Sequence, residues 1–149
     1  MRHPSQIWKT HLLMSVLAVT LCAGQSAWAQ AKAEKAFTAV VTDAQGVETE
    51  VKHIHFYWEE KVSETAFVPH EIKEVPVKRG TATVKVKFET IKQIDVKPSP
   101  DGGPPNMAIS LTNGKTGEFA LAIHGSFRGI SDFGEVELQA KDLRKIVFK

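Results

Sequence analysis

The 149-residue chain contains a single cysteine, Cys22, which lies in its N-terminal segment. A chain cleaved after that segment has no disulfide and no thiolate metal ligand, so its stability depends on a packed core. The chain also lacks HExxH and CxxC metal motifs and the Gly-x-Ser-x-Gly pattern of serine hydrolases. Residues 125–129 (Gly-Ser-Phe-Arg-Gly) do not match a phosphate-binding loop, and we expect a turn there. We therefore predict that the protein is not an enzyme and holds no cofactor.

Residues 1–29 have the pattern of a signal peptide. A short basic leader without acids is followed by an apolar or weakly polar run at 12–23, and small residues stand at Ala27 and Ala29. This order predicts cleavage before Gln30 and a periplasmic or secreted protein. The run is shorter than the roughly 20 residues that a membrane span needs, so we expect no span. Lipidation of Cys22 remains an alternative, although the large Leu21 before it is unusual for a lipoprotein signal.

The predicted mature chain has no net charge. Removal of Arg2 and Lys9 leaves 17 basic residues against 17 acidic ones, so the pI near 8.7 of the whole chain arises partly from its leader. A balanced chain gives no electrostatic argument for binding nucleic acid, and we expect no such partner.

From residue 37 onward the chain has the alternation of β-strands, which predicts an all-β protein, a small barrel or a sandwich built from two similar antiparallel halves. The first half covers residues 30–96, with a loop excursion at 59–70, and the second covers 107–149. Residues 97–106 contain four prolines and two glycines and are the predicted linker. Whether the halves form one core or two stays open.

The two halves resemble each other in sequence. Residues 82–97 align without a gap with residues 134–149, at an offset of 52. Five apolar pairs coincide: Val84 with Val136, Val86 with Leu138, Ile91 with Leu143, Ile94 with Ile146 and Val96 with Phe148. An internal duplication explains this, and chance similarity of two amphipathic strands is the alternative. The alternation predicts that Val84, Val86 and Phe88 face the core while the intervening lysines face solvent.

The pattern in residues 134–148, Gly-x-Val-x-Leu and then Leu-x-x-Ile-x-Phe after a short turn, resembles the closing strand, 3₁₀ turn and strand of SH3-like and Sm-like small β-barrels. The resemblance covers about 16 residues in each half and no binding motif of either family, so it assigns no site residue. It implies a small barrel or sandwich in a class that usually binds rather than catalyses.

His53 and His55 are the candidate metal ligands. Two strand residues separated by one project from the same face, close enough for two imidazoles to share an ion. His70 or His124, with Glu59 or Glu60, would have to complete the site. The alternative is a solvated strand face, because the sequence spacing indicates no third ligand.

An aromatic strand leading into the excursion is the better candidate for a binding surface. Aromatic side chains beside an adaptable loop are common in recognition surfaces, although the same residues also suit a core. The predicted interaction surface consists of Tyr57, Glu59, Glu60, Phe67 and Val68.

These observations favour an exported, non-catalytic binding or accessory protein of the bacterial cell envelope. Its expected partner is an envelope protein or an extracellular polymer. The alternative is a periplasmic metal-binding or small-ligand-binding protein that uses the face of His53 and His55. The sequence leaves the oligomeric state, the partner and the pathway open.

Overall fold

The structure is a computed structural model, and it describes residues 35–149. The predicted leader, its cleavage before Gln30 and Cys22 lie outside the described residues. None of the helices in the described part has the length and apolarity needed to cross a membrane.

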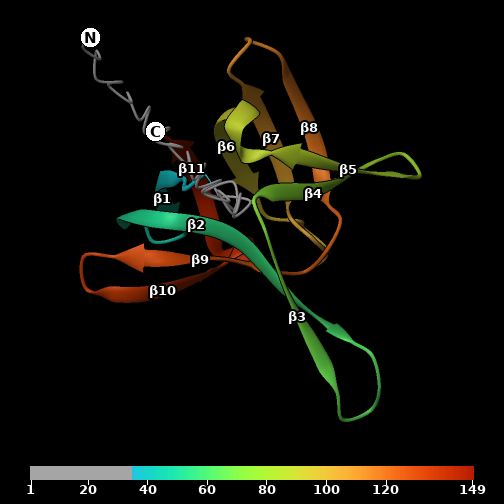
Figure 1. Ribbon diagram of the computed structural model, residues 1–149. Coiled ribbons are helices and arrows are strands. Elements are labelled where there is room, and N and C mark those ends of the chain that lie inside the picture. The colour runs from blue at the N-terminus through green and yellow to red at the C-terminus, as the bar shows by residue number, and fades with distance from the viewer. Residues whose placement is uncertain (1–34) are drawn as a thin grey trace, which may run out of the picture. The chain divides into compact units, whose positions relative to one another are not determined.

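The described residues form one antiparallel sheet of eleven strands (Figure 1). Ten strands follow the order β10-β9-β2-β1-β11-β6-β7-β8-β4-β5, and β3 pairs with β2 beside this path. The all-β, antiparallel prediction is confirmed. The sheet does not close into a barrel, because β10 and β5 end the path without pairing with each other. The strands are β1 (Thr38–Asp43), β2 (Glu48–Lys61), β3 (Phe67–Ile72), β4 (Glu74–Arg79), β5 (Ala82–Lys87), β6 (Ile91–Lys97), β7 (Asn106–Leu111), β8 (Thr116–Leu121), β9 (Ser126–Ser131), β10 (Gly134–Gln139) and β11 (Leu143–Phe148).

Element boundaries repeat along the chain. The hairpin β4–β5, the 3₁₀ helix η1 (Phe88–Thr90) and β6 recur 52 residues later as β9–β10, η2 (Ala140–Asp142) and β11. The starts of β1 and β2 recur 68 residues later as those of β7 and β8. The two offsets differ because the first repeat contains an elongated β2 and the additional strand β3. The structure therefore has two similar antiparallel repeats.

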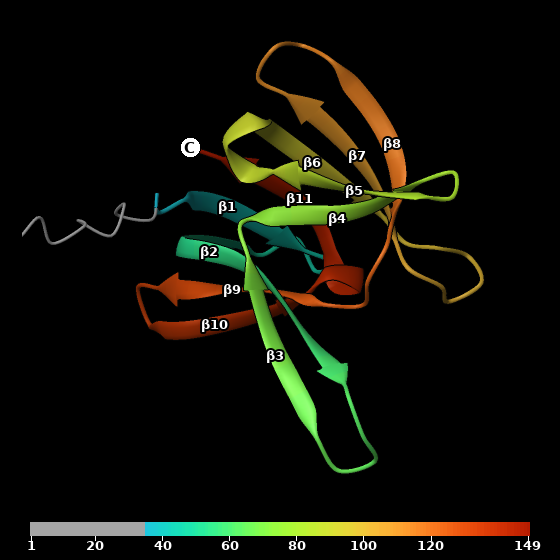
Figure 2. The ribbon, with the colours of Figure 1, turned by 45° about the vertical axis from the view of Figure 1, so that its right-hand side comes forward.

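The repeats exchange strands in space. Strand β2 of the first repeat pairs with β9 of the second, and β8 of the second pairs with β4 of the first. As a result, β11-β1-β2-β9-β10 and β6-β7-β8-β4-β5 are two equivalent five-stranded groups, each drawn from both repeats. The groups meet where β11 pairs with β6 (Figure 2). The boundary between the sequence repeats is therefore not a boundary between compact units.

Both groups share one hydrophobic core. Within residues 35–149 the buried apolar side chains form a single cluster that includes Phe56, Phe127, Phe88, Ile94 and Ile146. The Phe56 and Phe127 rings lie 5.4 Å apart at their centroids, and Phe127 lies 6.4 Å from Phe88 of the other repeat. The aromatic contacts thus connect the two repeats.

The predicted burial of β5 is wrong in part. Phe88 is buried as expected, but Val84 is 38% exposed and Val86 is only partly buried. Strand β5 is the last strand of the sheet, so no neighbour covers its far side. Its apolar side chains line an open groove, which is described below.

Residues 125–129, predicted as a turn, instead enter strand β9. The backbone of β9 comes close to that of its neighbour β2 at Gly129, opposite a bulge at residues 53 and 54 of β2. A Cβ atom at Gly129 would lie 2.4 Å from Cγ1 of Val51 and 2.6 Å from the Lys52 carbonyl oxygen. Contacts this short cannot be accommodated without moving backbone, so only glycine suits the crossing.

We predict that Gly129→Ala destabilises the protein by about 1 to 3 kcal/mol, because the added methyl group forces β9 away from β2. Urea denaturation measures the change. Glu135→Ala on the neighbouring strand β10 is the control, and as an exposed substitution it should cost less than about 0.5 kcal/mol. Equal stability of Gly129→Ala and wild type would contradict the tight crossing.

Candidate functional site

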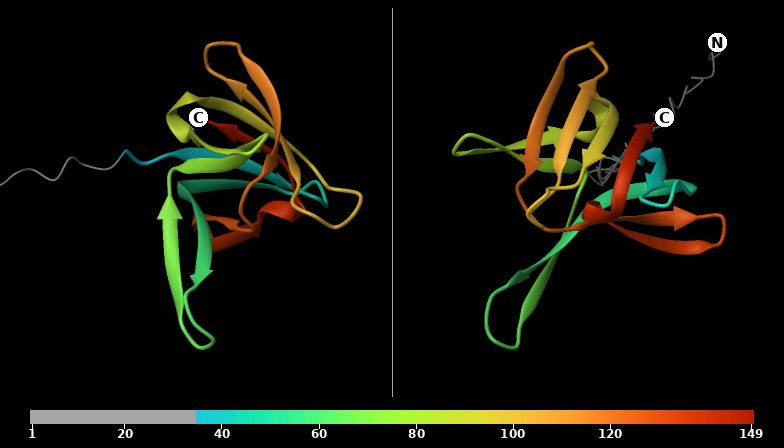
Figure 3. Two further views of the ribbon diagram at one scale, coloured as in Figure 1. Left: turned by 90° about the vertical axis from the view of Figure 1, so that its right-hand side faces the viewer. Right: turned by 180° about the vertical axis from the view of Figure 1, so that it is seen from behind.

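The predicted excursion is a protruding β-hairpin, called the arm here and formed by residues 58–70. Strand β2 pairs with β9 only as far as Tyr57, and beyond this point it pairs with β3 alone. The arm projects away from the rest of the sheet, on the side opposite β7 and β8 (Figure 3). Its turn is closed by the amides of Val62 and Ser63, which donate to the Ala66 carbonyl. Backbone pairing therefore extends to the tip of the arm.

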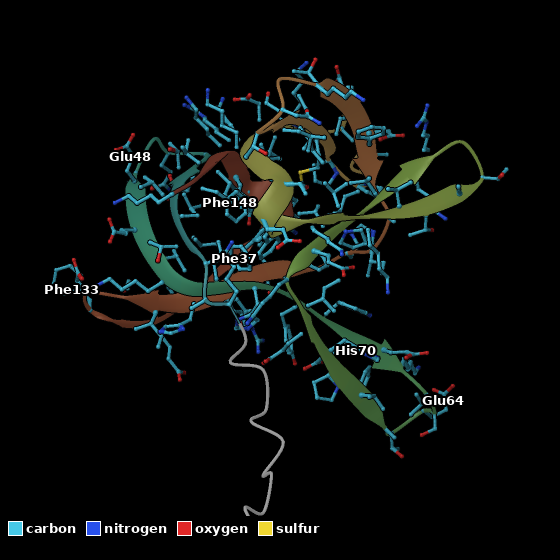
Figure 4. The ribbon with its side chains drawn as sticks, turned by 45° about the horizontal axis from the view of Figure 1, so that its top comes forward. Phe37, Glu48, Glu64, His70, Phe133 and Phe148 are labelled. Atoms are coloured by element: carbon cyan, nitrogen blue, oxygen red, sulfur yellow. The ribbon has the colours of Figure 1, made fainter. Side chains whose placement is uncertain are left out.

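One face of the arm carries a stacked aromatic pair. The indole of Trp58 and the ring of His70, which are cross-strand partners, lie 4.7 Å apart at their centroids. His70 Nε2 lies 2.9 Å from a carboxylate oxygen of Glu60, and Val68 pairs with Glu60 on the same face. His70 and Glu64 are labelled on the arm in Figure 4. These contacts link the side chains of Trp58, His70 and Glu60 along this face.

The opposite face carries Glu59 and Phe67, and Tyr57 lies on the same side at the base of the arm. The Tyr57 hydroxyl donates to Glu59 at 2.6 Å. Phe67, the cross-strand partner of Lys61, is 55% exposed at the tip. The predicted interaction surface is therefore divided between two faces, with Tyr57, Glu59 and Phe67 on one face and Glu60 and Val68 on the other. Its two exposed apolar residues, Phe67 and Val68, are neighbours in the chain near the tip but lie on opposite faces.

Arg128 on β9 connects the base of the arm to β10. Its guanidinium lies 3.3 Å from the centroid of the Tyr57 ring, and Nη2 lies 3.0 Å from a Glu137 oxygen. Ser126 donates its hydroxyl to the same carboxylate at 2.9 Å. Burial alone would lower the pKa of Arg128, but the hydrogen bond and charge of Glu137 outweigh it and raise that pKa. The guanidinium is a fixed cation at the base of the arm.

His53 and His55 line a polar cleft of about 560 Å³, called the histidine cleft here. Its other polar side chains come from β3, β9 and β10. Nε2 of His55 lies 3.6 Å from Glu71, too far for a hydrogen bond. Within the described residues, His55 Nε2 and Arg128 Nε are the buried side-chain nitrogens without a hydrogen-bond partner. The polar residues that line the cleft are His53, His55, Glu71, Arg128, Glu135 and Glu137.

A β-bulge places the two histidines. His53 has a φ of 53°, a left-handed conformation that is uncommon for a non-glycine residue. The bulge turns the next amide, that of Ile54, toward the Phe37 carbonyl at 3.0 Å. The His53 carbonyl lies 3.1 Å from Nδ1 of His55. The backbone thus orients the His55 ring, and strand alternation alone does not.

Neither His70 nor His124 is grouped with this pair. His70 stacks on Trp58, on the face of β2 opposite His55. His124 lines a separate depression with Tyr57 and Glu59. Among residues 35–149, no group of three or more His, Cys, Asp or Glu side chains could hold a metal ion.

A second depression, the basic groove, lies between β5, β7 and β8. It measures about 470 Å³, and its lining is mostly apolar, with Val84, Val86, Ile109, Leu111 and Phe119 among the residues. Sequence reasoning missed this groove because alternation predicted buried valines on β5. Its rim carries Arg79, Lys85, Lys87 and Lys115.

A protein-family model described as "Uncharacterised protein" matches residues 32–149. The chain belongs to this family. A protein of Aquifex aeolicus (strain VF5), described as "Uncharacterized protein", is 27% identical over 121 residues, which cover 76% of this chain and 88% of the relative. No solved structure matches the chain. The family match spans every described strand, so the arm, the histidine cleft and the basic groove all lie within it.

In this family member, Tyr57 is the only tyrosine, so its titration can be followed alone. Its hydrogen bond to Glu59 raises the pKa of the phenol, and burial and the charge of Glu59 act in the same direction. Because the pKa of Tyr57 is raised in the folded state, the protonated phenol stabilises the folded state relative to the unfolded one. This stabilisation is present below about pH 10 and is lost as the pH rises through the pKa of the folded state. We predict that a pH titration followed by tyrosinate absorbance has its midpoint above about pH 10, and that Glu59→Gln lowers this midpoint. Glu60→Gln, on the opposite face, should leave the midpoint unchanged.

Proposed function

We propose that the protein is an exported, non-catalytic binding protein of the bacterial cell envelope, and that it binds a partner protein through the arm. Export is supported by the basic leader, the short apolar run and the small residues before Gln30. A binding role is supported by the arm, which contributes little to the shared core and yet is built with ordered contacts on both faces.

The observation that carries the proposal is the apolar tip of the arm. Val62 and Phe67 are each 55% exposed, and Val68 is also exposed, on a hairpin that pairs with no third strand beyond Tyr57. Exposed apolar groups near a projecting turn are typical of interaction sites, and here they lie on both faces of the hairpin. Burying a phenylalanine against a partner contributes about 1.5 to 3 kcal/mol.

The charge of the arm indicates the chemistry of its partner. Residues 58–70 contain three glutamates, Glu59, Glu60 and Glu64, and one lysine, Lys61, which forms an ion pair with Glu64. The matching surface is therefore an apolar depression bordered by basic residues, because opposite charges steer association and select the partner.

The proposed class also agrees with the resemblance to SH3-like and Sm-like folds. Both repeats contain the strand, 3₁₀ turn and strand of that pattern, as β5-η1-β6 and β10-η2-β11. We propose that each five-stranded group is a variant of such a fold, completed by strands of the other repeat.

Pull-down from the envelope fraction of the producing cell tests the proposal. The double variant Phe67→Ser/Val68→Ser should lose the partner that wild type captures, with affinity reduced roughly ten- to hundredfold by the lost apolar contact. Its folding stability should change by less than about 0.5 kcal/mol per site, because both side chains are exposed.

Phe133→Ser is the matched control. Phe133 is fully exposed at 103% on the β9–β10 turn, so this variant also removes an exposed aromatic ring, and from a different turn (Figure 4). It should capture the same partner as wild type. Loss of the partner in both variants, or in neither, would contradict binding through the arm.

The second candidate function is binding of a small polar ligand in the histidine cleft. The two unpartnered nitrogens, His55 Nε2 and Arg128 Nε, favour it, because buried polar atoms normally have partners. Three glutamates in the lining disfavour an anion and suit a neutral ligand that offers hydroxyl donors and acceptors. We propose a saccharide of an extracellular polymer as that ligand.

N-acetylglucosamine is a suitable probe, because it has hydroxyl groups and an amide carbonyl. We predict that titration shifts the Arg128 Nε–H resonance in NMR spectra and that Arg128→Lys reduces binding about tenfold, the effect of one lost hydrogen bond. Zn²⁺ serves as the contrasting probe. A zinc-dependent rise in melting temperature that disappears in His53→Gln/His55→Gln would support metal binding instead.

A further inference from the structure

The basic groove has four cations on its rim and no carboxylate in its lining. Within the described part of the chain, no ion pair is formed by these side chains, Arg79, Lys85, Lys87 and Lys115. Unpaired like charges around an apolar surface repel one another and raise the local positive potential. The groove is therefore suited to an apolar group that carries negative charge.

This charge is specific to one of the two five-stranded groups. At the offset of 52, Lys85 and Lys87 correspond to Glu137 and Gln139. Glu137 is paired with Arg128 and Ser126. The sheet scaffold alone thus does not require a basic rim, since the equivalent strand β10 carries different side chains.

The arm has the complementary properties. Its tip exposes Val62, Phe67 and Val68, and its glutamates outnumber its lysine. The groove offers exposed Val84 beside partly buried Phe119 and Val86, bordered by lysines. The arm and the groove carry charges of opposite sign, and both expose apolar side chains. Contact between the arm and the groove therefore buries apolar surface and brings opposite charges together.

We infer that the arm of one copy of this chain docks in the basic groove of a second copy. The inference rests on the proposed function, because it names a partner for the same arm. The arm projects on the side opposite β7 and β8, so it does not reach the groove of its own chain (Figures 1 and 3). The contact joins two different patches and is heterologous, so successive copies form an open chain unless the rotation between them closes a ring.

Sedimentation velocity of the protein, in the form its cell produces, tests this inference with two variants. The arm variant is Phe67→Ser/Val68→Ser, and the groove variant is Lys85→Glu/Lys87→Glu. Wild type should self-associate as its concentration rises from micromolar to millimolar, and each variant alone should associate at least about tenfold more weakly. A mixture of the two variants should form a dimer, because one contributes an intact groove and the other an intact arm.

Lys141→Glu/Arg144→Glu, on η2 and β11, is the matched control, since it makes the same change of charge at exposed positions outside the groove. It should associate as wild type does. Adding Glu60→Lys/Glu64→Lys to the groove variant should restore part of the association, because the arm is then net positive and faces the two glutamates introduced at the groove, beside the unchanged Arg79 and Lys115. Added salt should weaken wild-type association, since the Debye length falls from about 10 Å at 0.1 M to about 3 Å at 1 M.

Three results overturn the inference: a monomeric wild type at every concentration, association that neither variant reduces, and a variant mixture that stays monomeric. The envelope pull-down separates this failure from failure of the proposed function. If the protein is monomeric and the arm variant loses an envelope partner, the self-association is rejected and the proposed function stands. If the protein self-associates through the arm and the arm variant retains every envelope partner, the inference stands and binding of an envelope partner by the arm is rejected.

Discussion

The pairing of β6 with β11 is the contact on which the rest of the structure depends. Ile94 pairs with Ile146, and these are equivalent positions of the two repeats. The neighbouring pairs are Asp95 with Lys145 and Gln93 with Val147. The offset of 52 that relates the repeats converts one of these pairs into the other, so the ladder has local two-fold symmetry about the pair of isoleucines. Both isoleucines are fully buried. Because the two five-stranded groups meet here, this ladder joins them into one sheet over one core.

The same symmetry explains where the two groups differ. Strand β2 pairs with β9 at both ends of a bulge, whereas the equivalent pairing of β8 with β4 is limited to Leu121 with Val77 and Ala120 with Lys78. The insertion that elongates β2 and adds β3 occurs in the first repeat alone. The group that contains β2 and β9 therefore carries the arm and the histidine cleft. The group that contains β4 and β8 has only a short pairing between these two strands and carries the basic groove. The two groups thus have equivalent scaffolds, and local differences give them distinct surfaces.

Periodicity predicted the all-β fold and the repeat because alternation and turn residues act locally. The alignment of Ile94 with Ile146 follows from the pattern of residues alone. The exchange of strands was not predictable in this way, because periodicity does not name the partner of a strand. Arg128 was missed for the same reason: its contacts with Tyr57 and Glu137 exist only once β9 lies between β2 and β10. The left-handed His53 depends on the bulge opposite Gly129, a tertiary constraint.

The free edges of the sheet favour association through side chains over addition of strands. The terminal strands β5 and β10 carry lysines and glutamates, and charged edge strands resist pairing with another chain. On the arm, β3 contains Pro69, which has no amide hydrogen and interrupts any further ladder. The free edges therefore leave projecting side chains as the accessible surfaces of the sheet. The apolar tip of the arm and the apolar floor of the basic groove are two such surfaces, and the residues around them carry opposite charges.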